Sequence, residues 1–241
     1  MKTAFYALAA TLPLVSACSA DTPDTELEEA DTVSEAEAMA RDLPAGEFMD
    51  LQLGGKIKGP QGEELNTGLY FDGVVFADMR SFVACPAGMD PCDPATAPAG
   101  TVYTYVHTIF PGGDNDPDTG DGEGADNSHV ERAQAFRMTR PAHGFTGGVG
   151  YSKLAAAAAM GEPGKVIVTC VDGGLAWTLY AGDGGDQWEF KEPLTVYWQS
   201  TLPPAGPANA YAIDADYTLA GGEGPYPAAS STAMNACLPG A

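Results

Sequence analysis

Apolar and polar residues alternate in short runs along most of the chain, and turn residues separate these runs. The runs are rich in β-branched and aromatic residues and are bounded by Gly, Pro or Asp, which is typical of β-strands. The clearest predicted strands cover residues 68–77, 101–110, 165–171, 175–181, 194–200 and 210–219. Asp172-Gly173-Gly174 predicts a tight hairpin turn, because Asp-Gly accepts positive φ angles.

The alternation also assigns residues to strand faces. Within 101–110, Tyr103, Tyr105 and His107 share one face, because side chains two residues apart point the same way in a strand. A histidine beside two tyrosines fits either core packing or the rim of a binding surface, so these three are the candidate ligand-binding residues. The three tryptophans, Trp177, Trp188 and Trp198, fit a core better than an exposed platform for sugar rings.

One helix interrupts the predicted strands. Ser152 is a suitable N-cap for Lys153 to Met160, and Gly161 suits the position after the last turn. The other runs predict strands and no repeat of fixed length is visible, so we expect a mainly β, antiparallel fold, a β-sandwich or jelly-roll-like domain with one short Ala-rich helix.

Composition narrows the classes of partner. The 241 residues include 33 acids and 11 bases, for a net charge of −22. Such a charge repels phosphate backbones, so no nucleic acid is expected as a partner, and it also opposes docking on anionic lipid headgroups. The 30 Gly and 19 Pro fit many turns between short strands.

The first 18 residues carry a targeting signal. Lys2 precedes an apolar run from Ala4 to Val15, which is too short to span a bilayer and is typical of a signal peptide. The run ends in Val15-Ser16-Ala17-Cys18, which resembles the lipobox of bacterial lipoproteins. This resemblance implies cleavage after residue 17, lipidation of Cys18 by diacylglycerol and then an acyl chain such as palmitate, and, with Ser19 following, anchoring to the outer membrane on its periplasmic or surface face. Ordinary secretion is the alternative.

The rest of the chain divides into two parts. Residues 18–42 contain many acids and no aromatic residue, which predicts a flexible acidic tether. Residues 43–241 form the single predicted β-rich domain. With residues 1–17 as signal peptide and Cys18 lipidated, four cysteines remain, and an even number in an oxidising compartment predicts two disulfides. The favoured pairs are Cys85–Cys92 and Cys170–Cys237.

Residues 112–128 form an acidic, Gly-rich stretch with a D-x-D-x-D start. The stretch lacks the Gly and Glu that an EF-hand loop needs at later positions, so only a looser Ca²⁺ site stays open beside a solvated insertion. Its candidate ligands are Asp114, Asp116, Asp118 and Asp121. Ca²⁺ is the one cofactor that the sequence suggests.

No motif for a nucleophile, nucleotide or zinc site is visible, so the sequence suggests no catalytic residue. We therefore expect a cell-envelope lipoprotein with a non-catalytic domain that binds a glycan or protein ligand. An envelope hydrolase with an unrecognised active site and a purely structural envelope component are the alternatives. An exposed Trp/Tyr strip would favour binding, and a pocket with paired carboxylates would favour hydrolysis.

Overall fold

The computed structural model describes residues 41–58, 63–112 and 130–238. Cys18, the tether up to residue 40 and the candidate Ca²⁺ ligands Asp114, Asp116, Asp118 and Asp121 lie outside these residues. The described part is mainly β with one α-helix. Its strands are β1 (Arg41–Leu43), β2 (Gly46–Glu47), β3 (Leu53–Lys56), β4 (Leu65–Phe71), β5 (Val74–Pro86), β6 (Tyr103–Pro111), β7 (Ala133–Met138), β8 (Phe145–Tyr151), β9 (Lys165–Val171), β10 (Gly174–Tyr180), β11 (Leu194–Ser200), β12 (Pro204–Ala215) and β13 (Thr218–Pro227).

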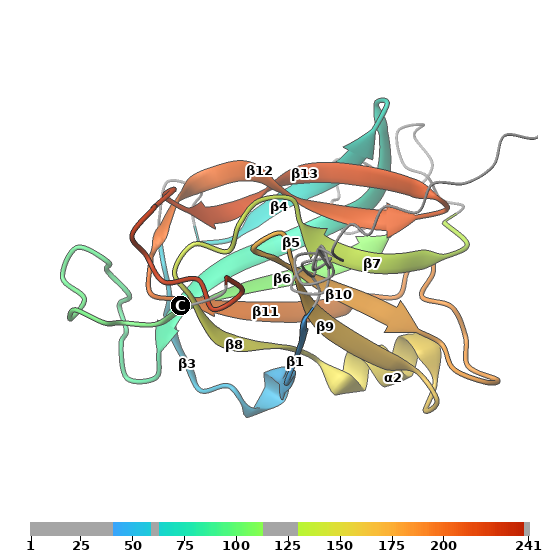
Figure 1. Cartoon of the computed structure of the whole chain (residues 1–241), viewed down its shortest axis with the longest axis horizontal. Coiled ribbons are helices and arrows are strands. Elements are labelled where there is room, and N and C mark those ends of the chain that lie inside the picture. The colour runs from blue at the N-terminus through green and yellow to red at the C-terminus, as the bar shows by residue number, and fades with distance from the viewer. Residues whose placement is uncertain (1–40, 59–62, 113–129, 239–241) are drawn as a thin grey trace, which may run out of the picture. The chain divides into compact units, whose positions relative to one another are not determined.

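All of these strands belong to one sheet, in which every pair except β2 with β8 is antiparallel. The order is β1-β9-β10-β7-β12-β13-β4-β5-β6-β11-β8-β2, with β3 added beside β5. The sheet curls into a half-barrel (Figure 1). The hydrogen bonding therefore links the strands into one curled sheet. The expected sandwich or jelly roll, with two separate sheets, is not confirmed by this strand pairing.

Two segments connect the edges of the curled sheet. Near the start of the described chain, β1 pairs with β9 and β2 pairs with β8, so residues 41–47 reach both edges. Near its end, Ala236 N donates to Phe145 O of β8, and the Cys170–Cys237 disulfide ties the same segment to β9. The long strands nearest the two edges, β8 and β9, thus have part of their outer backbone covered by short segments, which limits edge-to-edge association.

The interior of the curl holds the aromatic core. Phe136 of β7 and Tyr211 of β12 stack at 5.8 Å, and His107 of β6 lies 4.3 Å from the Tyr211 ring. Trp177 and Trp198 are fully buried, and Trp177 Nε1 donates to Gly150 O of β8. The tryptophans therefore fill the core, as the sequence favoured, and the ring contacts join strands that are distant in the sheet.

The predicted helix is confirmed as α2 (Lys153–Met160), and a short 3-10 helix, η1, covers Phe48–Asp50. Ser152 Oγ accepts from Ala155 N at 3.2 Å, and Gly161 has a φ of 75°. Both predicted disulfides, Cys85–Cys92 and Cys170–Cys237, are present. The Asp172-Gly173 turn joins β9 to β10 with positive φ at both residues.

Two of the predicted strands, over 68–77 and 210–219, are wrong, because each is a hairpin. In the first, β4 ends at Phe71 and β5 begins at Val74, and Asp72-Gly73 forms the turn. In the second, β12 ends at Ala215 and β13 begins at Thr218. Asp216 and Tyr217 form the turn with φ angles of 47° and 63°. The apolar alternation continues through the turn, because Ala215 and Leu219 happen to keep the two-residue spacing, so the pattern gave no sign of the reversal.

Candidate functional site

The predicted ligand-binding residues lie inside the curl. Tyr105 and His107 have no exposed surface, and Tyr103 is 4% exposed. The neighbouring residues on the other face of β6, Thr104 and Val106, are also buried. The proposed role of Tyr103, Tyr105 and His107 in ligand binding stays a prediction, and the described structure encloses all three side chains in the core.

Ser81 and His107 form a buried polar pair on adjacent strands. Ser81 Oγ lies 2.8 Å from His107 Nδ1, and both residues are fully buried. Burial lowers the pKa of His107 from its usual value of 6.5 to about 3, so the ring is neutral at physiological pH. A Ser–His pair resembles the start of a hydrolase site, but a substrate has no surface on which to reach these side chains.

Two ring nitrogens in this core, His107 Nε2 and Trp198 Nε1, make no hydrogen bond of normal geometry with a described residue, although the Trp198 indole is close enough to Tyr211 to offset part of the rise that burial causes in the pKa of its hydroxyl. Buried polar atoms without partners are destabilising, by about 1 to 3 kcal/mol for each group. Trp198 stacks on Tyr105, with ring centres 4.4 Å apart, and this contact helps to hold the indole in place. In this part of the core, aromatic packing therefore contributes more to stability than hydrogen bonding of the ring nitrogens.

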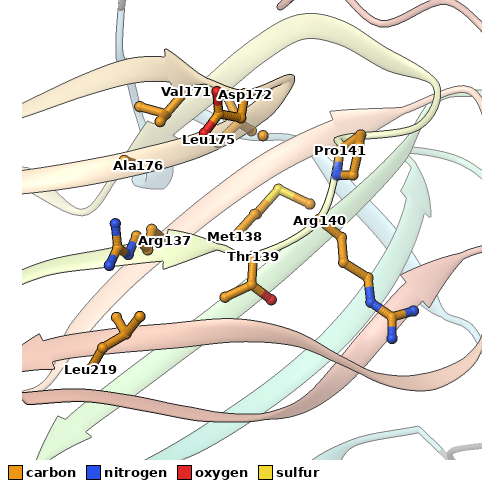
Figure 2. A pocket seen from close by; sticks show the side chains of 11 residues that line it. Arg137, Met138, Thr139, Arg140, Pro141, Val171, Asp172, Leu175, Ala176 and Leu219 are labelled. Atoms are coloured by element: carbon orange, nitrogen blue, oxygen red, sulfur yellow. The ribbon is translucent and has the colours of Figure 1, made fainter.

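The best candidate for a binding site is a shallow pocket of about 280 Å³ where β7 ends beside the β9–β10 hairpin. Its lining comes from three segments: residues 137–141, the hairpin between Val171 and Ala176, and Leu219 of β13. Figure 2 shows Arg137 and Arg140 on opposite sides of Met138 and Thr139. The two guanidinium groups therefore lie at opposite sides of the pocket and point away from each other.

Neither arginine of this pocket makes an ion pair with a described residue. Arg140 lies over the Tyr226 ring, 5.9 Å from its centre, which orients the guanidinium group without neutralising it. The pocket's carboxylate is Asp172, at the tip of the hairpin, and it forms no ion pair with either arginine. No arginine of the described chain forms an ion pair, so what distinguishes Arg137 and Arg140 is that both line one pocket.

Glycine at position 174 allows the pocket to form. A Cβ atom on Gly174 would lie 2.9 Å from Arg140 O and 3.3 Å from Met138 Cβ. The β9–β10 hairpin can therefore approach the end of β7 only because residue 174 has no side chain. Ala142 N donates to Gly173 O at 2.7 Å and fixes this approach.

Two other pockets are less suited to a charged ligand. One of about 620 Å³ lies beside the Cys85–Cys92 loop, and its lysines, Lys56 and Lys58, are paired with Glu64 and Glu63. Another, of about 290 Å³, lies between the alanines of α2 and residues 191–193. Their charges are matched or few, so the Arg137–Arg140 pocket remains the candidate.

Sequence reasoning missed Arg137 and Arg140. The local signal was weak: Arg137 and Arg140 are two of the five arginines of the chain and stand three residues apart before Pro141. The walls of the pocket come from β9, β10 and β13, which only the pairing of distant strands brings beside β7. Among the described residues, no group of three or more His, Cys, Asp or Glu side chains could hold a metal ion.

Comparison of this chain with protein-family models, with curated proteins and with solved structures found no match. No described helix has the length and apolar character needed to cross a bilayer. The functional argument therefore rests on the residues of the chain.

Proposed function

We propose that this chain is a lipid-anchored protein of the cell envelope whose β domain binds an anionic ligand in the Arg137–Arg140 pocket and catalyses no reaction. One observation carries the binding part: two of the five arginines of the chain, Arg137 and Arg140, line one pocket, and neither pairs with a described carboxylate. Arginine binds carboxylate and phosphate groups through two parallel N–H donors.

The ligand bears carboxylate or phosphate groups, because these match a guanidinium group in shape and charge. A glycan with acidic groups and an acidic peptide both fit this description. The pocket volume of about 280 Å³ lies just below the range of sites that enclose a drug-sized ligand, so it admits a small fragment. A larger ligand would place only an end or a side chain in the pocket.

The curled sheet serves this function as a jelly-roll-like scaffold. Phe136, Tyr211 and His107 pack together from β7, β12 and β6, and this core makes the strands under the pocket rigid. A ligand site built on rigid strands loses little conformational entropy on binding. The hydrolase alternative has no comparable support, because the buried Ser81–His107 pair offers no access to a substrate.

The anchor is supported by the predicted signal peptide over residues 1–17 and by Cys18 directly after it. Metabolic labelling with an alkyne fatty acid in a bacterial host would test it. We expect the chain to take up the label and fractionate with membranes, and the Cys18→Ala variant to lose the label. Equal labelling of the two proteins would contradict the lipid anchor.

The pocket can be tested with three anionic probes: inorganic phosphate, succinate and a tetraglutamate peptide. A probe at 100 times its Kd adds about 2.7 kcal/mol to the free energy of unfolding, which raises Tm by several degrees. We expect at least one probe to raise Tm and the R137Q/R140Q double variant to lose this shift. The R80Q/R132Q variant removes the same charge outside the pocket and should keep it. A shift that survives in R137Q/R140Q, or no shift with any probe, would refute the proposal.

A further inference from the structure

The β12–β13 turn contains a tyrosine in the left-handed backbone region. Three hairpins of the described chain place Asp at the first turn position with positive φ: Asp72, Asp172 and Asp216. Two of them continue with Gly73 and Gly173, the residue that this turn favours. The third continues with Tyr217, whose φ is 63°. A bulky side chain at such a φ is strained, so this tyrosine weakens the turn in which it stands.

Tyr217 contributes nothing to the core in return, because its side chain is 90% exposed. Strain at an exposed aromatic residue points to a role outside the folding of the chain, since a glycine would make a more stable turn. Tyrosine is a frequent anchor of protein interfaces, because it brings a large contact area with few rotatable bonds.

The turn that carries Tyr217 is held rigidly. The Asp216 carboxylate accepts from Arg132 N at 3.0 Å and from Glu131 N at 3.4 Å, and Asp216 N donates to Arg132 O at 2.9 Å. These bonds attach the hairpin tip to the chain that enters β7. The exposed tyrosine is thus presented in a fixed place, which lowers the entropy lost when a partner binds it.

Other exposed apolar residues lie at the same end of the sheet. β13 and β4 are antiparallel neighbours, with Gly221 opposite Tyr70, so the β12–β13 and β4–β5 hairpins extend toward the same end of the sheet, with their turns apart in Figure 1. The two hairpins share a set of large side chains that are at least 40% exposed: Tyr70, Phe71, Val74, Tyr217 and Leu219. We call this set the hairpin surface. Exposed apolar side chains gathered in one place are typical of interaction sites.

We propose that the hairpin surface, with Tyr217 as its anchor, docks a partner protein through an apolar pocket bordered by Lys and Arg. The charge at the surface selects this occupant. Asp72 and Asp216 occupy the two turns, and Glu131 is matched by its neighbour Arg132, so the turn end of the surface is acidic, whereas Arg137 lies in the pocket that Leu219 also lines. A basic border on the partner complements this charge and speeds association.

The same charge disfavours the other occupants. A second copy of this chain carries the same net charge of −22 and would be repelled. A lipid surface would have to take up the turn carboxylates along with the aromatic rings, and an anionic leaflet would repel the whole domain. Arg41 of β1 pairs with Cys170, near the end of β9 that lies away from the hairpin surface. The chain that leads to the proposed anchor therefore joins the domain at a distance from this surface.

A photo-crosslinker at position 217 tests this proposal in the native envelope. Tyr217→p-benzoylphenylalanine should give an adduct with one protein, and the same crosslinker at Met49, which is 68% exposed on η1 at another edge, should not. The crosslinked protein is then purified, and its affinity for the full chain is measured at several salt concentrations. We expect binding that weakens as salt rises, because opposite charges meet at the border.

The variant Tyr217→Gly separates binding from folding. It removes the strained residue, so we expect Tm to rise by about 2 °C while affinity for the crosslinked protein falls at least tenfold. Met49→Ser should leave the affinity unchanged. The proposal is overturned if position 217 gives no specific adduct, if the adduct is a lipid or a second copy of this chain, or if Tyr217→Gly binds the partner as tightly as the original protein.

Discussion

Ser81 Oγ and His107 Nδ1 lie 2.8 Å apart on the neighbouring strands β5 and β6, with no exposed surface on either residue. The contact occupies the interior of the curled sheet, where the Tyr211 and Phe136 rings lie 4.3 and 5.8 Å from the imidazole. No charged side chain of the described residues lies among these ring and hydroxyl contacts. The imidazole is therefore held neutral by burial, and its protonation opposes folding.

This burial predicts a pH dependence of stability. The pKa of His107 is about 3 in the folded chain and 6.5 in the unfolded one, so the unfolded state binds more protons between these values. Stability from this group is fully present above pH 6.5 and is lost as pH falls toward 3. Between pH 7 and pH 5 we expect a loss of about 2 kcal/mol in the free energy of unfolding.

Urea denaturation at the two pH values measures this loss. The variant His107→Gln does not titrate, so its stability should fall about 2 kcal/mol less than that of the original protein over the same range. The carboxylates titrate equally in both proteins and cancel in the comparison. His143→Gln, at a residue outside this core cluster, serves as the control. An identical pH response in His107→Gln would contradict the prediction.

Local signals in the sequence were enough for some elements. Helix α2 was predicted at both ends, because Ser152 and Gly161 act on the backbone within a few residues of themselves. The Asp172-Gly173 turn was predicted for the same reason. The turn at Asp216-Tyr217 was not, because tyrosine at a positive φ is rare and carries no turn signal.

Features that depend on distant strands were beyond the sequence. β6 is buried on both faces, so alternation showed that Tyr105 and His107 share a face without showing that this face is enclosed. The Arg137–Arg140 pocket needs β7, the β9–β10 hairpin and β13 together, and their order in the sheet does not follow their order in the chain. Strand order depends on the packing of the whole core, which no local pattern encodes.

The two disulfides should differ in their effect on stability. Cys170–Cys237 closes a segment of 67 residues and Cys85–Cys92 one of 7. Loop-closure entropy then predicts that C170A/C237A lowers the free energy of unfolding by about 4 kcal/mol and C85A/C92A by about 2 kcal/mol. Urea denaturation of the two double variants measures both. A greater loss in C85A/C92A would show that the contacts of the small loop matter more than chain entropy.

The N-terminus of α2 has two caps from different parts of the chain. Ser152 Oγ accepts from Ala155 N, and the Glu47 carboxylate of β2 accepts from Lys153 N at 3.0 Å. We expect Ser152→Ala to lower the free energy of unfolding by about 1 kcal/mol, and Ser152→Gly by only a few tenths. Thermal denaturation compares the two variants. Negligible losses in both variants would indicate that Glu47 alone satisfies this end of the helix.

Asp216 should be more important for stability than its counterpart in the next hairpin. Its carboxylate accepts two backbone N–H groups, from Glu131 and Arg132, whereas no side-chain hydrogen bond of Asp72 joins its turn to another described segment. Asp216→Ala leaves both donors without this acceptor, so we expect a loss of about 1 to 2 kcal/mol, against less than 0.5 kcal/mol for Asp72→Ala. Urea denaturation of the two variants provides the comparison. If Asp72→Ala is as destabilising as Asp216→Ala, the bonds to residues 131 and 132 do not hold the β12–β13 turn in place, and the rigid presentation of Tyr217 loses its structural basis.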